Sequence, residues 1–225
     1  MNTEKIFAFI KSLAAHNDRE WFAAHKEEYL EVKALFEQMV QDAILRIATF
    51  DKSIEHVQVK DCTYRIYRDT RFSDDKSPYK RHMGAYINAK GKKSLHGGYY
   101  IHLEPGNCMI AGGNYWYPPK LMAKIRESIM DNIDEYKGIV DAPAFKQYFP
   151  VIGEEQLVGA PRGYKKNDPN LKYIQPKQWD VAYYVPDSFF CQPDWLDNME
   201  AAYREMKPFL DFINYTVDEF LEDEY

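Results

Sequence analysis

The spacing of apolar residues predicts two helices at the start of the chain. Apolar side chains recur every three or four positions from Ile6 to Leu13 and again from Phe22 to Ile47, as on the buried face of an amphipathic helix. Asn17 is expected to separate the helices and to cap the second one, with Glu20 returning a hydrogen bond in a capping box. The pattern therefore predicts an N-terminal helical hairpin.

From about residue 57 to residue 113 apolar and polar positions alternate, which is the period of β-strands. The alternation is clearest from Cys62 to Ile66, from Met83 to Ile87 and from Tyr99 to Leu103. The turn-forming residues Glu104 to Asn107 separate two apolar runs, so the chain on either side of them is expected to form an antiparallel hairpin. This segment predicts a sheet whose strands are antiparallel or mixed.

Helical spacing returns after the predicted sheet. It runs from Met122 to Tyr136, with Gly138 as the expected C-terminal cap, and again from Asp194 to Phe220. Pro208 lies inside the second pattern and is expected to kink or divide that helix, because proline lacks an N–H and clashes with the preceding turn.

The chain between these helices is less regular. Prolines and short aromatic clusters from 142 to 190 predict irregular structure with a short helix near Phe145 and one strand at 181–185. We therefore expect a single α+β domain over residues 1–225. Its central sheet, at about residues 57–113, would be packed by the helical hairpin, the middle helix and the C-terminal helix.

Composition narrows the classes of protein that the chain can belong to. With 45% hydrophobic and 28% charged residues it resembles an ordinary globular protein, and its formal net charge of -6 gives no overall attraction to nucleic acid or anionic lipid. No apolar run predicts a signal peptide or a membrane span. The three cysteines, Cys62, Cys108 and Cys191, are far apart and odd in number, which predicts reduced thiols. We expect a cytoplasmic protein with no membrane partner.

A basic segment stands out against this acidic background. Residues 60–93 contain ten lysines and arginines against four aspartates. Guanidinium groups can contact two oxygens of a phosphate or carboxylate, and tyrosine rings can stack on a base or a sugar. A second basic stretch lies at residues 162–177. The predicted ligand-binding residues are Arg65, Arg68, Arg71, Lys76, Tyr79, Lys80, Arg81 and Arg162.

Strand alternation also predicts a polar face on the sheet. It places Tyr100, His102 and Glu104 on one side of their strand, and His82 and Tyr86 on one side of theirs. If the two strands are neighbours, these polar side chains are expected to lie together.

These residues favour a binding function. The leading hypothesis is binding, and processing if chemistry occurs, of an anionic, phosphorylated small molecule or a nucleic acid. Asp69 and His102 are the candidate general bases, because such a role requires a titratable group beside fixed cations. The alternative is a non-enzymatic protein-interaction domain in which the arginines form structural ion pairs with Asp69, Asp74 and Asp75. The sequence leaves open whether the protein is an enzyme.

No cofactor is implied by a motif, because the chain lacks a phosphate-binding loop, a dinucleotide-binding fingerprint and a nucleophile elbow. His96, His102 and Glu104, together with His82, are an alternative set of metal ligands. Their spacing matches no established metal signature. We therefore expect no bound metal, and a metal site at these residues is the alternative hypothesis.

Two segments, Arg65–Phe72 and Asp75–Lys80, resemble the signature of domain of unknown function family 2461. Further segments of this pattern lie along nearly the whole chain: Asn17–Phe22, Gly98–Gly106, Gly112–Gly113 and Pro161–Tyr164. The resemblance implies a mostly bacterial, uncharacterised family and therefore no particular reaction. It marks Arg65, Arg68, Asp69, Arg71, Phe72, Lys76 and Tyr79 as signature positions without assigned roles.

Overall fold

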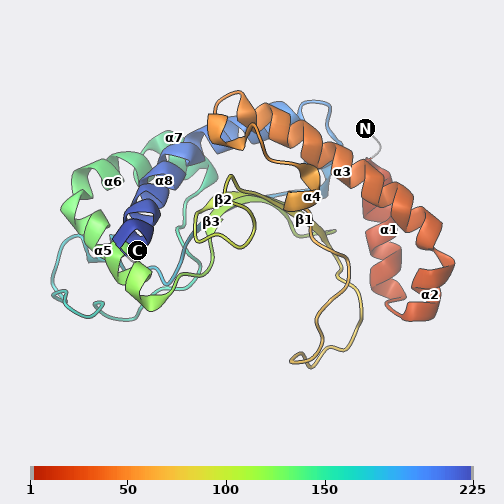
Figure 1. Cartoon of the computed structure of the whole chain (residues 1–225), viewed down its shortest axis with the longest axis horizontal. Coiled ribbons are helices and arrows are strands. Elements are labelled where there is room, and N and C mark those ends of the chain that lie inside the picture. Colours follow the sequence, from red (N-terminus) through yellow and green to blue (C-terminus); the bar gives the residue numbers. More distant parts are fainter. Residues whose placement is uncertain (1–2, 224–225) are drawn as a thin grey trace. The chain divides into compact units, whose positions relative to one another are not determined.

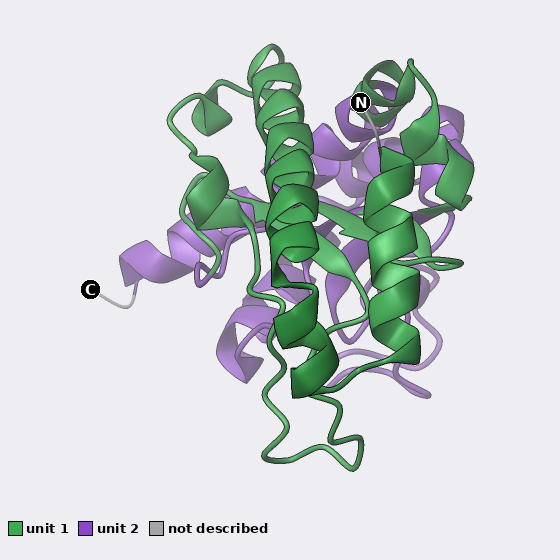
Figure 2. Cartoon of the chain, turned by 90° about the vertical axis from the view of Figure 1, so that its right-hand side faces the viewer, with its two compact units in different colours: residues 1–92, 100–110, 184–200 green, residues 93–99, 111–183, 201–225 purple. Residues whose placement is uncertain are grey.

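The computed structural model describes residues 3–223, which form helices and a four-stranded sheet (Figure 1). Helices account for 51% of the described residues, and strands with isolated bridges for 14%, which confirms the predicted α+β class. The chain divides into two compact units (Figure 2). Unit 1 comprises residues 1–92, 100–110 and 184–200, and unit 2 comprises residues 93–99, 111–183 and 201–225. The expectation of a single domain stays a prediction.

Unit 1 begins with the predicted helical hairpin. Helix α1 (Thr3–Ala15) packs against the long helix α3 (Lys26–Ala48), and the short helix α2 (Arg19–Ala24) lies between them in sequence. The apolar stripes that predicted these helices are buried, with Ile6 and Val32 fully inaccessible to solvent. Burial of these stripes, rather than intrinsic helix propensity, supplies most of the stability of such helices.

The predicted capping box is wrong. Asp18, not Asn17, is the N-cap of α2, and its carboxylate accepts a hydrogen bond from the backbone N–H of Trp21 at 2.8 Å. Asn17 has another role, because its side-chain amide pairs with the backbone of Tyr79. The amide oxygen accepts from the Tyr79 N–H and the amide nitrogen donates to the Tyr79 carbonyl, both at 3.0 Å. This pairing joins two segments 62 residues apart.

The four strands form one antiparallel sheet in the order β1-β2-β3-β4. They are β1 (Met83–Ile87), β2 (Gly98–Leu103), β3 (Cys108–Asn114) and β4 (Trp179–Val185). The predicted hairpin of β2 and β3 is confirmed. Its turn places Gly106 at a φ of 80°, a backbone conformation that glycine adopts without strain. The strand expected at 181–185 is also confirmed and begins slightly earlier.

The strand expected from Cys62 to Ile66 is wrong. Residues Val59–Cys62 form the short helix α4 instead, and the chain after it pairs with its neighbours only through isolated bridges, Thr63 with Ala85 and Tyr67 with Tyr79. Pro78 explains part of this irregularity, because it cannot donate a hydrogen bond to a regular ladder. The alternation of apolar residues here reflects an extended loop with one buried side, not a strand.

Unit 2 contains helices α5 (Pro119–Asp131), α6 (Ile133–Val140) and α7 (Pro143–Tyr148). The helix near Phe145 is thus confirmed, but the single middle helix is wrong, because the chain breaks at Asn132. Gly138 lies inside α6 and not at its cap. Its φ is not positive, so it does not adopt the left-handed conformation that a glycine cap requires.

The last helix, α8 (Trp195–Asp223), begins in unit 1 and continues through unit 2. Pro208 lies inside it without dividing it into two elements. Three short 3-10 helices complete the secondary structure: Lys52–Ile54, Leu171–Tyr173 and Asp187–Cys191.

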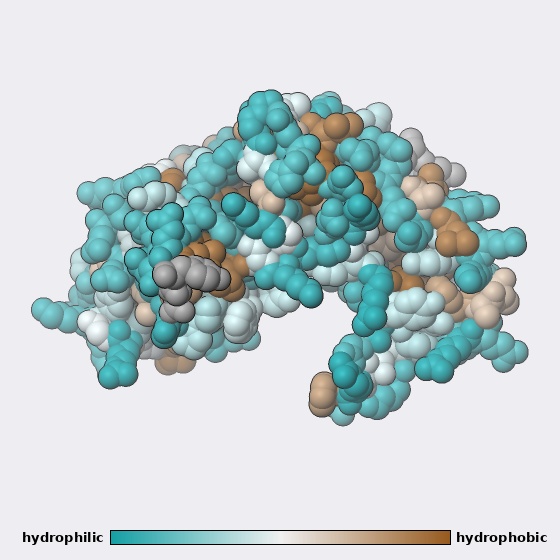
Figure 3. Space-filling view, in the orientation of Figure 1, coloured by the Kyte–Doolittle hydropathy of each residue, from teal (hydrophilic) through white to brown (hydrophobic). Residues whose placement is uncertain are grey.

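The surface shown in Figure 3 is mostly hydrophilic, with scattered apolar residues. Across residues 3–223 no helix combines the length and the apolar character that crossing a bilayer demands.

The Asn17 pairing yields a stability prediction. Replacing Asn17 by Ala removes two hydrogen bonds and leaves the polar backbone atoms of buried Tyr79 without them. We expect a loss of about 2–3 kcal/mol in the free energy of unfolding, measured by urea denaturation. Asn132→Ala is the control, because its exposed side chain bonds only to Ser128 in the preceding helix, α5. Equal stability of the two variants would contradict the role given to Asn17.

Candidate functional site

Residues 65–81, which we call the arginine loop, lie between α4 and β1. Arg68 is bound within the loop. Its guanidinium group donates to the Asp75 carboxylate at 2.5 Å, to the Ser77 carbonyl at 3.3 Å and to the Ser73 hydroxyl at 3.2 Å. Hydrogen bonds from the backbone and hydroxyl of Ser77, and then from Arg68, hold the pKa of Asp75 well below its usual range. Arg68 thus fastens the two sides of the loop together.

Arg71 is also paired. It donates two hydrogen bonds to the Asp69 carboxylate, from Nε at 3.0 Å and from Nη2 at 2.6 Å. The side-chain hydrogen bonds from Arg71 are the main reason that the pKa of Asp69 is lowered to about 2. A carboxylate so stabilised as an anion accepts protons poorly, which weakens the case for Asp69 as a general base.

The other predicted binding residues are scattered. Lys76 donates to the carbonyl of Thr70 at 3.0 Å, and Arg81 lies 3.9 Å from Asp75. The Tyr79 ring is buried and stacks on Phe22, with 4.0 Å between ring centroids. Arg162 is exposed and belongs to unit 2.

Three cations of unit 1 form a different group, Arg65, Lys80 and Lys92, which we call the cationic cluster. The ammonium groups of Lys80 and Lys92 lie 5.2 Å and 5.3 Å from the centre of the Tyr64 ring. Lys92 also donates to the carbonyl of Thr63 at 2.7 Å. Burial, and then the positive charges of Arg65 and Lys92, lower the pKa of Lys80. Within residues 3–223, no carboxylate forms a salt bridge with any member of the cluster.

Lys92 was missing from the predicted binding residues. Its position depends on the turn after β1, where the Asn88 side chain accepts from the Lys90 N–H at 2.8 Å and Gly91 has a φ of 85°. Such Asn and Gly turns are visible in a sequence, but the residue that Lys92 approaches is 29 positions away. The turn could have been predicted, and the contact with Thr63 could not.

A pocket lies beside this cluster. It is small, with a cavity volume of about 20 Å³, and it is open to solvent. Lys33 and Glu37 in its wall pair with each other at 2.9 Å, so they balance each other's charge. The remaining lining is largely aromatic and apolar, with one histidine: Tyr29, Phe36, Thr63, Tyr64, Ile66, His82 and Met83.

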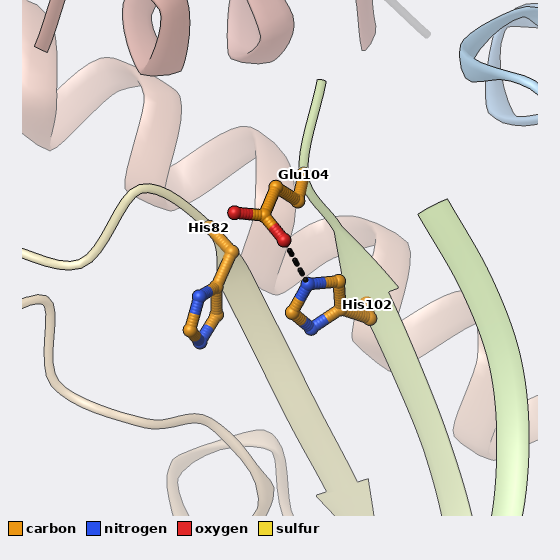
Figure 4. A group of neighbouring side chains, drawn as sticks. All are labelled: His82, His102 and Glu104. Carbon is orange, nitrogen blue, oxygen red and sulfur yellow. Dashed lines mark hydrogen bonds and ion pairs between the residues drawn. The ribbon is translucent and has the colours of Figure 1, made fainter. Parts of the chain in front are cut away.

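The polar face predicted on β2 is the second notable group in unit 1 (Figure 4). His102 Nε2 lies 3.1 Å from a Glu104 oxygen, and His102 Nδ1 lies 2.9 Å from the Tyr100 hydroxyl. An ionised carboxylate can only accept hydrogen bonds, so Nε2 carries the proton and Tyr100 donates to Nδ1. The His82 ring lies beside His102, with 4.4 Å between ring centroids. We call His82, His102 and Glu104 the histidine cluster.

Burial controls the charges in the histidine cluster. It lowers the pKa of His82 to about 4, with the neighbouring His102 adding to the effect, and it lowers the pKa of His102 despite the hydrogen bond to Glu104. Burial alone would raise the pKa of Glu104, but hydrogen bonds from Asn107 and His102 outweigh it and lower that pKa. The arrangement therefore sets two neutral imidazoles beside an ionised carboxylate.

The ligand atoms of the histidine cluster all lie within 4.8 Å of one another, close enough to hold a metal ion. His96, which the alternative metal set from the sequence also contained, instead contacts Asp218 at 2.8 Å and Ser94 at 2.8 Å within unit 2. Gly84 makes room for the arrangement, because a Cβ at that position would meet the Tyr100 hydroxyl at 2.6 Å.

Comparison with known proteins identifies the family. The profile of the family described as "Conserved hypothetical protein (DUF2461)" matches residues 5–212. The chain belongs to this family. The match confirms the resemblance carried by the signature segments, and the description of the family names no activity. No curated protein and no solved structure matches the chain.

The structure separates two kinds of arginine in the signature, which leads to a second prediction. Replacing Arg68 by Ala removes the contacts that fasten the arginine loop, so backbone amides of residues 69–77 should exchange with solvent about tenfold faster. Hydrogen-exchange mass spectrometry measures this. Arg71→Ala is the comparison, because its pair with Asp69 is exposed and should hold the loop much less. The same increase in both variants would refute the distinction.

Proposed function

We propose that the protein binds a small organic anion, carrying a phosphate or a carboxylate, at Arg65, Lys80 and Lys92. The observation that carries the proposal is the gathering of the Lys80 and Lys92 ammonium groups around Tyr64, with the charge of Arg65 also acting on Lys80. Among residues 3–223, no carboxylate forms a salt bridge with these three cations. Positive groups held near one another repel unless an anion lies between them. A bound phosphate would remove this repulsion and accept charge-assisted hydrogen bonds from the same groups.

The proposal keeps part of the predicted site. Arg65 and Lys80 stay in it, and Lys92 joins them. Arg68 and Arg71 are excluded, because carboxylates of the arginine loop already bind their guanidinium groups.

The rest of the ligand would lie along aromatic side chains. Tyr64 contacts the lysines of the cationic cluster and also lines the pocket, where the partly exposed Tyr29 offers further ring surface. A ligand with a flat apolar or aromatic body would lay that body against these rings while its anionic group contacts the cations. A small molecule suits this site better than a nucleic acid. Strong nucleic-acid binding uses many phosphate contacts, and the net charge of the chain is -6.

The alternative of a protein-interaction domain has two observations in its favour. Arg68 and Arg71 form ion pairs with Asp75 and Asp69, as that alternative expects. Phe72 in the arginine loop is 96% exposed, and the guanidinium carbon of Arg71 lies 5.8 Å from the centre of its ring. A single exposed apolar residue is common on monomeric proteins and does not make an interface. The unneutralised cations therefore favour the small-ligand function.

We also propose that the protein works in the cytoplasm. All three cysteines are free thiols, and burial raises the pKa of Cys62 to about 11 and that of Cys108 to about 12. Thiols that stay reduced and protonated suit a reducing compartment.

Binding of phosphate-containing compounds tests the proposal. Inorganic phosphate, pyrophosphate and ADP should raise the melting temperature at constant ionic strength, because a ligand that binds only the folded state stabilises it. Isothermal titration calorimetry then gives the affinity. Lys80→Gln and Lys92→Gln should each weaken binding about tenfold, the effect of losing one hydrogen bond to a charged group.

Arg71→Gln is the matched control, since it also removes one positive charge from unit 1 and should leave the affinity unchanged. The proposal fails if none of the three compounds binds, or if Arg71→Gln weakens binding as much as Lys80→Gln. Tight, steeply salt-dependent binding of a ten-nucleotide single strand, with no binding of the small anions, would favour nucleic acid instead.

A further inference from the structure

We propose that His82, His102 and Glu104 form a binding site for a divalent transition-metal ion such as Zn²⁺. The site shares no residue with the cationic cluster, so it stands or falls independently of the proposed function. It keeps His82, His102 and Glu104 of the alternative metal set considered from the sequence and leaves out His96.

The spacing of the ligand atoms fits an ion. Ligands that bind Zn²⁺ tetrahedrally at about 2.0–2.2 Å lie about 3.3–3.6 Å from each other. His102 Nε2 and the nearer Glu104 oxygen are 3.1 Å apart, close to this range. The widest separation in the cluster is at most 4.8 Å. A side-chain rotation that moves one ligand atom by about 1.5 Å would therefore bring all three ligands to metal-binding distance. Ordinary rotamer changes move side-chain atoms this far.

Neighbouring residues already hold two of the ligands in place. Metal-bound histidines usually donate their second ring N–H to an oxygen, and bound carboxylates usually accept a further hydrogen bond. Tyr100 provides that oxygen for His102, 2.9 Å from Nδ1, and the Asn107 amide donates to Glu104 at 2.8 Å. When a metal takes Nε2, the ring proton moves to Nδ1 and is donated to Tyr100. The change needs only the other neutral tautomer of His102.

Hydrogen bonds alone do not explain the position of His82. Both nitrogens of His102 are engaged by Tyr100 and Glu104. His82 lies against this pair, yet within residues 3–223 its own ring forms no hydrogen bond. Figure 4 shows its ring facing the His102 ring, with Glu104 above both. A third ligand to a shared ion accounts for the position of this imidazole.

The donor set indicates the class of ion. Two imidazole nitrogens and one carboxylate oxygen suit Zn²⁺, Co²⁺, Fe²⁺ or Mn²⁺, whereas Mg²⁺ and Ca²⁺ prefer oxygen ligands throughout. Three protein ligands also leave coordination positions for water or a substrate, as in catalytic zinc sites. His82 and Glu104 are partly exposed, and His82 lines the pocket, so an ion can reach the cluster from solvent.

Metal titration tests the site on the full chain after removal of any purification tag and treatment with a chelator. Equilibrium dialysis with Zn²⁺ should give one ion per chain. Co²⁺ should give the visible absorption of a four- or five-coordinate ion. His82→Ala and Glu104→Gln should each lower Zn²⁺ affinity at least tenfold, because each removes a ligand. Tyr100→Phe should lower the affinity about tenfold with unchanged stoichiometry, the usual effect of losing an orienting partner.

The matched control is His56→Ala, which removes an exposed histidine of unit 1 that bonds only to the Ala89 carbonyl. This variant should bind Zn²⁺ normally, as should Lys92→Gln, which separates the metal site from the anion site. Circular dichroism without metal checks each fold, and His82→Asn replaces His82→Ala if that variant unfolds. Uptake below one ion per chain in the unaltered protein, or equal uptake after loss of His82 and of His56, would overturn the proposal.

Discussion

The pairing of the Asn17 side chain with the backbone of Tyr79 is the contact on which the rest of unit 1 depends. The arginine loop has almost no regular secondary structure, so its backbone needs partners from elsewhere in the chain. Asn17 supplies two of them and imitates a neighbouring strand. The Phe22 ring stacks on Tyr79 at the same place. These contacts fix the end of the loop from which Lys80, His82 and β1 continue.

This anchoring explains several family signature residues without assigning them chemistry. Asn17, Phe22 and Tyr79 form one packed contact, and Arg68 and Asp75 close the loop beyond it. The cations of unit 1 differ in the sequence distance to the residues that they contact. Arg68 and Arg71 meet aspartates only a few residues away, whereas the fold brings Lys80 and Lys92 together around Tyr64. Cations with local carboxylates stabilise the loop, and those gathered by the fold are the ones that we propose bind a ligand.

The sequence predicted what depends on neighbouring residues. The β2–β3 hairpin followed from its turn, and the polar face of β2 followed from strand alternation. The predictions from the sequence failed where a residue far away in the chain determines the local structure. Asn17 has a good N-cap side chain, but Tyr79 engages it from 62 residues away and Asp18 takes the cap. Lys92 was not in the predicted site for the same reason. His82 and His102 met because β1 and β2 are neighbours in the sheet, which alternation alone does not establish.

The central claim is that the anion binds to the cationic cluster and not to Arg68 or Arg71, which already pair with carboxylates. Anomalous diffraction from a crystal soaked in tungstate, a heavy analogue of phosphate, tests it most directly. The account predicts an ordered ion in contact with the ammonium groups of Lys80 and Lys92, with the Arg68 and Arg71 pairs intact. An ion bound to Arg68 or Arg71 after displacement of Asp75 or Asp69, with none near Lys80, would contradict it.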